Sequence, residues 1–177
     1  MPRFLNAGCG ARDSAPLPLR FRDWEEVRLD SSLAVEPDFL APVTELPFDD
    51  DSFDAVYCSH TLEHLPEHEV PLALKEFRRV LKAGNRVYLH VPDLKVAAQR
   101  ILDDCPNQAI YQSPAGPVAA LDMVYGFRPF LACGIEGMEH RTGFTLALLS
   151  YRLEEAGLRL VEIVAANAEI AAVGEKP

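Results

Sequence analysis

The sequence predicts an α/β fold, with a doubly wound, mostly parallel sheet and an antiparallel hairpin at its C-terminal end. Three observations predict it: short apolar runs alternate with helical patterns, the first run ends in a glycine turn, and the last two runs lie only a few residues apart. The length of 177 residues suits a single domain over residues 1–177.

Apolar runs predict the first strands. Arg3–Ala7 is short and apolar and ends at the turn Gly8–Gly10. Glu26–Leu29 is expected as the second strand, closed by Asp30. Phe53–Ser59 is apolar throughout, which is typical of a central strand that is covered on both faces.

The clearest amphipathic helix begins at Val70, because apolar residues recur from there to Leu81 at helical spacing. Gly84 is placed to cap the C-terminal end of this helix. Arg86–Val91 is expected as the next strand, which Pro92 stops.

Two further helices are predicted from their capping residues. Asp93 can cap a helix that runs to about Asp104. Thr145 can cap another, which Gly157 ends.

The chain closes with two predicted strands, Arg159–Val164 and Glu169–Val173. They should be antiparallel neighbours, because a parallel crossover needs a dozen or more residues.

Two stretches lack a clear period. Ala11–Asp23 contains two prolines that disfavour a helix, and Cys105–Arg141 is interpreted as an inserted lid or substrate segment.

Charge and cysteine usage limit the possible functions. There are 17 Lys and Arg against 27 Asp and Glu, a formal charge of −10, so nucleic acid is not expected as a partner. The four cysteines form no CxxC pair, and Cys58 is read as a small buried hydrophobe. Neither a signal peptide nor an apolar run of about 20 residues is found, so we expect a soluble cytoplasmic protein without membrane contact.

The glycine turn Gly8-Cys9-Gly10 predicts a ligand site at the carboxyl end of the first strand. Asp30 follows 20 residues after Gly10 and can accept hydrogen bonds from ribose hydroxyls, or it can simply cap a turn before Ser31. A dinucleotide motif would need glycine at position 13, which is Asp13. A ligand with adenosine but no phosphate, such as S-adenosylmethionine, therefore fits better.

Four segments in order carry a resemblance: LNAGCG at Leu5–Gly10, Asp30, LPFDDDSFDAV at Leu46–Val56, and SHTLEHL at Ser59–Leu65. Together they resemble a class I S-adenosylmethionine-dependent methyltransferase, most closely the small type 11 group with an LNxGCG turn. The resemblance covers Phe4–Pro92. It implies a Rossmann-like fold, S-adenosylmethionine as cofactor, and methyl transfer to a small-molecule acceptor.

The resemblance also implies roles for individual residues. The backbone of Ala7, Gly8 and Gly10 would line the methionine part and ribose, and Asp30 would bind the ribose hydroxyls. The turn before Leu46 would flank the adenine, and the pocket would be closed by Ser59 and His60. Pro42 stands where the family usually has an Asp for the adenine amine, so the backbone of Val43 would have to replace that contact.

Three histidines are candidates for a general base, because imidazole titrates near neutral pH: His60, His64 and His140. Each could instead only orient a loop. The acceptor site is expected to include Tyr125, Phe127, Arg128 and His140. Because of Pro42 and the irregular chain in place of a first helix, a catalytically silent cofactor-binding or interaction protein remains an alternative.

Two short motifs resemble metal-binding patterns. His60 and His64 match the HxxEH pattern of a zinc peptidase, but Pro66 should disrupt the required helix and no third ligand is evident. Asp49–Asp51 lacks the spacing of a calcium loop and is expected to be a solvated turn. The sequence therefore predicts no metal.

Overall fold

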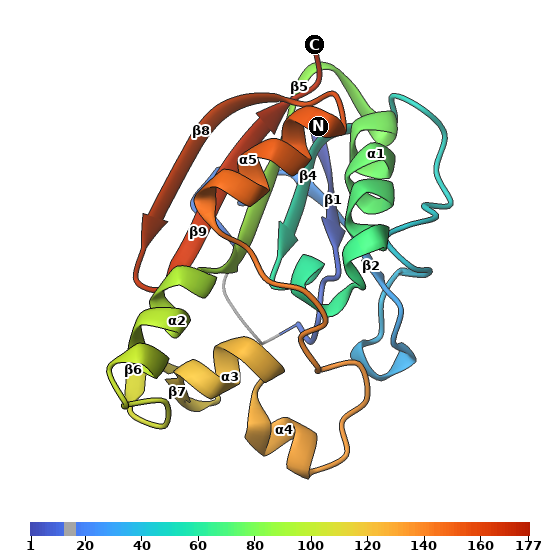
Figure 1. Ribbon diagram of the computed structural model, residues 1–177. Helices are drawn as coiled ribbons and strands as arrows, with labels where there is room; N and C mark the ends of the chain where they lie inside the picture. Colours follow the sequence, from blue (N-terminus) through green and yellow to red (C-terminus); the bar gives the residue numbers. More distant parts are fainter. Residues whose placement is uncertain (13–16) are drawn as a thin grey trace.

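The computed structural model describes residues 1–12 and 17–177, and these contain a seven-stranded sheet in the order β3-β2-β1-β4-β5-β9-β8 (Figure 1). The neighbours from β3 to β5 are parallel, whereas β9 runs antiparallel to both β5 and β8. This confirms the predicted parallel sheet with its C-terminal hairpin. The strands are β1 (Arg3–Ala7), β2 (Glu25–Asp30), β3 (Phe39–Leu40), β4 (Phe53–Ser59), β5 (Leu81–Pro92), β8 (Arg159–Ala166) and β9 (Glu169–Glu175).

Two helices, α1 (Val70–Val80) and α5 (Leu146–Glu155), pack on one face of the sheet (Figure 1). The carboxyl ends of β1 and β4 point toward a group of smaller elements. These are α2 (Leu94–Leu102), β6 (Ala109–Ser113), β7 (Gly116–Ala119), α3 (Ala120–Tyr125) and α4 (Arg128–Ala132). None of the helices in the described part of the chain is long and apolar enough to span a lipid bilayer.

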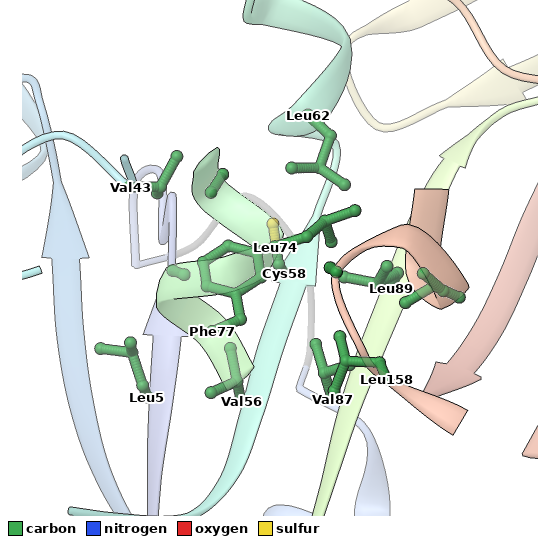
Figure 2. Packing of buried hydrophobic residues seen from close by; sticks show 14 of the residues in the cluster. Leu5, Val43, Val56, Cys58, Leu62, Leu74, Phe77, Val87, Leu89 and Leu158 are labelled. Carbon is green, nitrogen blue, oxygen red and sulfur yellow. The ribbon is translucent and has the colours of Figure 1, made fainter. Parts of the chain in front are cut away.

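The main core lies between the sheet and α1 and α5. Leu74 and Phe77 of α1 are fully buried against strand residues such as Leu5 and Val56 (Figure 2). Side chains alternate along a strand, so Phe4 faces the opposite side, where it belongs to a smaller aromatic cluster. This two-sided burial explains why the strands appear in the sequence as continuous apolar runs.

Both predicted caps are confirmed. The Asp93 carboxylate accepts from the backbone N–H of Lys95 at 2.9 Å, and the Thr145 hydroxyl accepts from Leu148 N–H at 3.3 Å. Each contact satisfies a backbone donor that the first turn of a helix leaves without a partner.

The predicted helix cap at Gly84 is wrong. The α1 helix ends at Val80, and Leu81 already has extended backbone angles and pairs with Phe53 of β4. Gly84 lies within β5, with φ of +76°, and its N–H donates to the carbonyl of Lys176 at 2.8 Å. The apolar pattern continues from the helix into the strand without a break. Leu81 is expected to be buried in either element, so the pattern alone does not show where the helix ends.

The segment 105–141, which we call the satellite segment, contains more regular structure than its sequence suggested. It folds into the β6–β7 hairpin and the helices α3 and α4, around a small core of its own with α2. Its elements span only four to six residues each, too short to show a period. The prediction for Ala11–Asp23 falls partly outside the described residues; within them, Leu19–Phe21 forms a single 3-10 turn.

Candidate functional site

The turn after β1 requires glycine at position 8. Gly8 has φ of +70°, and a Cβ there would lie only 2.1 Å from the hydroxyl oxygen of Thr61. The N–H groups of Gly8 and Cys9 both donate to the carbonyl of Leu29, at 2.9 and 3.0 Å. Gly10, with φ of +57°, also occupies the left-handed region. The turn is thereby held against the carboxyl ends of β2 and β4.

Asp30 lies directly beside this turn. One carboxylate oxygen accepts from Gly10 N–H at 3.0 Å, and the other accepts from Ser32 N–H at 2.9 Å. The capping interpretation is therefore met in part, since Ser32 in turn caps the 3-10 turn Leu33–Val35. Each carboxylate oxygen has two lone pairs, so one acceptor position on each remains for a ligand.

Arg28 is a site residue that sequence reasoning missed. It is only 3% exposed, and its guanidinium donates to the carbonyls of Gly10 and Glu36. The available signal was a charge two residues before Asp30 within an apolar strand, on the same face. Burial raises the pKa of the neighbouring Cys9 thiol to about 11, although Arg28 lowers it, so Cys9 is not a thiolate at neutral pH.

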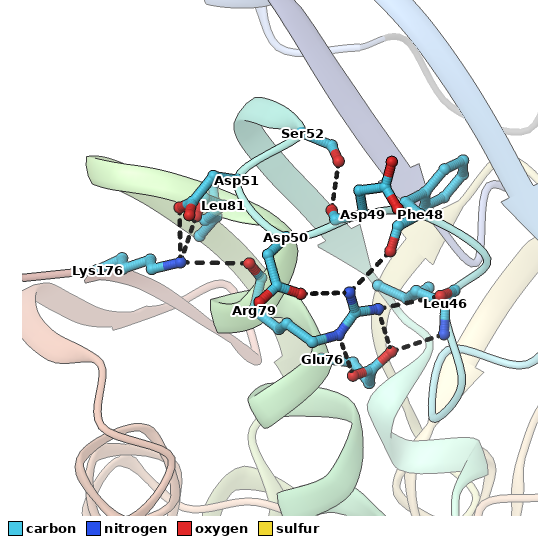
Figure 3. Close-up of polar contacts among 10 residues, drawn as sticks. All are labelled: Leu46, Phe48, Asp49, Asp50, Asp51, Ser52, Glu76, Arg79, Leu81 and Lys176. Atoms are coloured by element: carbon cyan, nitrogen blue, oxygen red, sulfur yellow. Dashed lines mark hydrogen bonds and ion pairs between the residues drawn. The ribbon is translucent and has the colours of Figure 1, made fainter.

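The LPFDDDS motif owes its conformation to Arg79 of α1 (Figure 3). The guanidinium donates to the carbonyls of Leu46 and Phe48, at 3.0 and 2.7 Å, and pairs with Asp50 at 2.9 Å. Glu76 completes the contact by accepting from Leu46 N–H at 2.8 Å. Arg79 and Glu76 thus form a clamp that holds in place the loop expected beside the adenine. Just before it, Val43 is buried in the main core.

His60 follows β4 with φ of +50°, an uncommon conformation for a residue with a side chain. Its ring nitrogens bind Glu63 at 3.2 Å and Glu169 at 2.9 Å. Burial alone would lower the pKa of His60, but the two carboxylates outweigh it and raise the pKa to about 10. Glu169 also binds His90 at 3.3 Å. Sequence reasoning missed Glu63, Glu169 and His90 as members of this cluster.

His64 and His140 lie close together although they are far apart in the sequence. Nδ1 of His64 contacts the carbonyl of Glu139, 75 residues further along the chain, at 3.1 Å. Nδ1 of His140 contacts the carbonyl of Met123 at 2.8 Å, and the two ring centroids are 5.0 Å apart. Burial lowers the pKa of His140, so its ring is neutral at pH 7. All three predicted histidines therefore surround Glu63.

The HxxEH arrangement is not formed as a zinc peptidase would need it. Only the 3-10 turn Leu62–His64 is present, and His60 lies outside it with both nitrogens on carboxylates. A different set is close together: one ligand atom from each of Glu63, His64 and His140 lies within 4.8 Å of the others.

The predicted acceptor residues are placed unevenly. Arg128 pairs with the buried Asp122 at 2.7 Å, which makes it a structural residue of the satellite segment. Phe127 packs on Phe130, and Tyr125 is largely exposed. Of these four residues, His140 is the one whose side chain packs against His64.

Two hollows lie near the sheet. The larger, about 290 Å³, is lined by residues that include Phe21, Tyr57, Tyr88 and His90. The other, about 90 Å³, lies behind the glycine turn and is lined in part by Cys9 and Arg28. Asp30 is not among the residues that line either of these two hollows, although Cys9 of the glycine turn lines the smaller one.

Comparisons with known proteins point to methyltransferases. Residues 5–89 match the type 11 family described as a methyltransferase domain. A probable methyltransferase, ltbC, from Aspergillus luteorubrus is 52% identical over 40 residues, which span 22% of this chain and only 14% of that protein.

Two solved structures share the fold. A S-adenosylmethionine-dependent methyltransferase from Methanosarcina mazei superimposes with a TM-score of 0.64 at 18% identity, covering 99% of this chain and 92% of that one. The 1,6-didemethyltoxoflavin-N1-methyltransferase of Burkholderia thailandensis was solved with 1,6-didemethyltoxoflavin and S-adenosylhomocysteine bound. It superimposes with a TM-score of 0.59 at 17% identity, covering 99% of this chain and 71% of that one. The family match over residues 5–89, just under half of the chain, and the shared fold together support a class I S-adenosylmethionine-dependent methyltransferase domain in this chain.

Proposed function

We propose that this protein transfers a methyl group from S-adenosylmethionine to a small-molecule acceptor. The observation that carries the proposal is the 3.0 Å contact between the Asp30 carboxylate and Gly10 N–H. It joins the acidic end of β2 to the glycine turn, beside β1 and β4, between which the strand order reverses. Open α/β sheets bind their ligands at this point.

The residues present suit the cofactor. Asp30 retains acceptor positions for the ribose hydroxyls, and the backbone of Ala7, Gly8 and Gly10 offers a surface without side chains for the methionine part. The backbone of Val43 would lie at the adenine, while Ser59 and His60 would close the site at the end of β4. S-adenosylmethionine, when bound, supplies an electrophilic methyl group.

Methyl transfer is an in-line displacement, so the protein contributes mainly alignment and the exclusion of water. An oxygen or nitrogen acceptor also needs to lose a proton. His60 is unsuited to accept it, because its raised pKa keeps it protonated at pH 7. His64 and His140 lie close together, each with Nδ1 in contact with a backbone carbonyl, and His140 is neutral.

Two further observations support a small acceptor. The formal charge of −10 disfavours nucleic acid. The Burkholderia neighbour holds 1,6-didemethyltoxoflavin together with S-adenosylhomocysteine. The comparisons give the catalytically silent alternative no support.

Calorimetric titration with S-adenosylhomocysteine tests the proposal. Asp30→Asn keeps the shape but loses the charge that binds the ribose, so affinity should fall about 10- to 100-fold. The matched control is Asp23→Asn, an exposed carboxylate that precedes β2 at the opposite edge of the sheet, and it should bind like the wild type. Equal affinity of Asp30→Asn and Asp23→Asn would contradict the assignment.

A further inference from the structure

We propose that Glu63, His64 and His140 form a binding site for a divalent transition-metal ion. One ligand atom from each lies within 4.8 Å of the other two, a spacing that a single ion can bridge. The sequence indicated only the His60–His64 pair, because His140 reaches this place through tertiary structure alone.

Glu63 provides an independent sign of a missing ligand. Its side chain is 2% exposed, and one carboxylate oxygen accepts from His60. The other oxygen, Oε2, is buried without a hydrogen-bond partner among the described residues. Buried carboxylate oxygens are nearly always satisfied, since an unpaired one is costly, so a cation is expected beside Oε2.

The two histidines present the right nitrogen. In each ring Nδ1 lies at hydrogen-bond distance from a backbone carbonyl, of Glu139 for His64 and of Met123 for His140. A carbonyl can only accept, so Nδ1 carries the proton and Nε2 keeps its lone pair. Metal-bound histidines typically donate their other ring N–H to a carbonyl in this way, which fixes the ring orientation.

The backbone already holds the three ligands together. The N–H groups of Arg141 and Thr142 donate to the carbonyl of Glu63 at 2.8 and 3.1 Å, and His140 N–H donates to Tyr125 at 3.1 Å. The site therefore does not have to be assembled from mobile segments when an ion binds, which reduces the entropic cost of binding.

Two imidazoles and one carboxylate suit Zn²⁺ and its first-row neighbours, and a three-residue set leaves a coordination position open. His60 would act on the metal only through Glu63, as an outer-shell partner. If the proposed methyl transfer is correct, an acceptor hydroxyl in the open position would release its proton to water more easily, and His64 and His140 would then serve as ligands instead of as the base. The metal site itself does not depend on that step.

Zn²⁺ titration of chelator-treated protein by calorimetry tests the inference, with Co²⁺ absorption as a second readout. We expect one ion per chain, and about 100-fold or greater loss of affinity in both His64→Gln and His140→Gln. The matched control is His68→Gln, whose side chain is 81% exposed and which should bind like the wild type. Circular dichroism checks that each variant is folded.

Three outcomes would overturn the proposal: no binding by the wild type, unchanged binding in His64→Gln and His140→Gln, or equal loss in His68→Gln. A water molecule would then satisfy Oε2 of Glu63. His60→Gln separates the HxxEH pair from this site. We expect it to weaken binding less than His140→Gln does, and the reverse order would favour the His60–His64 pair. S-adenosylhomocysteine binding is measured separately, so failure here leaves the proposed function untouched.

Discussion

Gly8 shows how the absence of one side chain shapes the turn after β1. Thr61, from the chain that follows β4, lies so close to Gly8 that no Cβ fits between them. The hydroxyl of Thr61 also lies 3.4 Å from the carbonyl of Gly8, so the turn after β1 and the loop after β4 are in direct contact. The close approach of these two segments depends on glycine at this position.

Gly8→Ala should destabilise the protein more than Gly134→Ala. Both glycines have nearly the same positive φ, +70° and +73°, so both substitutions strain the backbone. Only Gly8 also faces a clash, because Gly134 has no atom within 4 Å of a new Cβ. We expect Gly8→Ala to cost about 1–3 kcal/mol more in the free energy of unfolding, measured in urea. Equal costs would show that Thr61 moves away freely.

Glu169 makes the stability depend on pH. Burial raises the pKa of its carboxyl, but His60 and His90 outweigh this and lower it from 4.5 to about 2. The folded state therefore gains stability above pH 4.5, and this gain is lost as the pH falls from 4.5 toward 2.

The difference in unfolding free energy between wild type and Glu169→Gln should accordingly be largest near pH 6 and should shrink toward pH 3. Urea unfolding at several pH values measures it. Glu162→Gln, an exposed carboxylate on the adjacent strand β8, controls for the loss of one negative charge. A difference that stays constant over this range would refute the role of Glu169.

Single residues of the site differ in how far the sequence reveals them. The contact between the glycine turn and Asp30 could be predicted, because these residues belong to one local motif and its neighbouring strand. Glu169 could not, because it reaches His60 and His90 only through the antiparallel register of β5 and β9, in which it pairs with Pro92. Glu63 was visible in HTLEH, but its burial was not.

At the scale of elements, the attachment of the Leu46–Ser52 loop to α1 rests on Arg79. Its guanidinium makes three hydrogen bonds to that loop and two to Glu76, and the latter keep the pKa of Glu76 low (Figure 3). Two of the hydrogen bonds to the loop go to the backbone carbonyls of Leu46 and Phe48.

Arg79→Met keeps the aliphatic stem but removes these hydrogen bonds, and we expect a loss of about 2 kcal/mol in the free energy of unfolding. Lys75→Met, at an exposed position of the same helix, is the control and should change stability by less than about 0.5 kcal/mol. S-adenosylhomocysteine affinity should fall with Arg79→Met as well, since the substitution loosens the loop that we propose to lie beside the adenine. A stability equal to that of Lys75→Met would contradict the clamp.

Elements with a long period or a clear cap were predictable, and short ones were not. The β1 and β4 strands have the predicted bounds, and α1 begins at the predicted Val70, because burial on one or both faces shapes their sequences. The β3 strand has only two exposed residues, Phe39 and Leu40, and carries no pattern. Helices α3 and α4 are stabilised by contacts within the satellite segment rather than by local sequence.

The whole molecule contains a large core and a small one. The large core joins α1 and α5 to the sheet, whereas the satellite segment shares a core of only four buried residues with α2. Fewer buried apolar contacts mean a lower free energy of local opening.

Hydrogen exchange measured by mass spectrometry should therefore divide the chain in two. Amides of β1, β4 and β5 should exchange only through global unfolding, while those of residues 109–135 should exchange at least about tenfold faster. Addition of Zn²⁺ should slow exchange near His140 if the metal site is correct. Uniform protection throughout the chain would mean that the satellite segment unfolds only together with the sheet.

The most direct test of the central claim is a crystal structure of the protein with S-adenosylhomocysteine. We expect both ribose hydroxyls within about 3 Å of the Asp30 carboxylate and the homocysteine part against the backbone of Gly8 and Gly10. A nucleoside bound instead in the hollow lined by Tyr57 and Tyr88, with Asp30 facing solvent, would contradict the account.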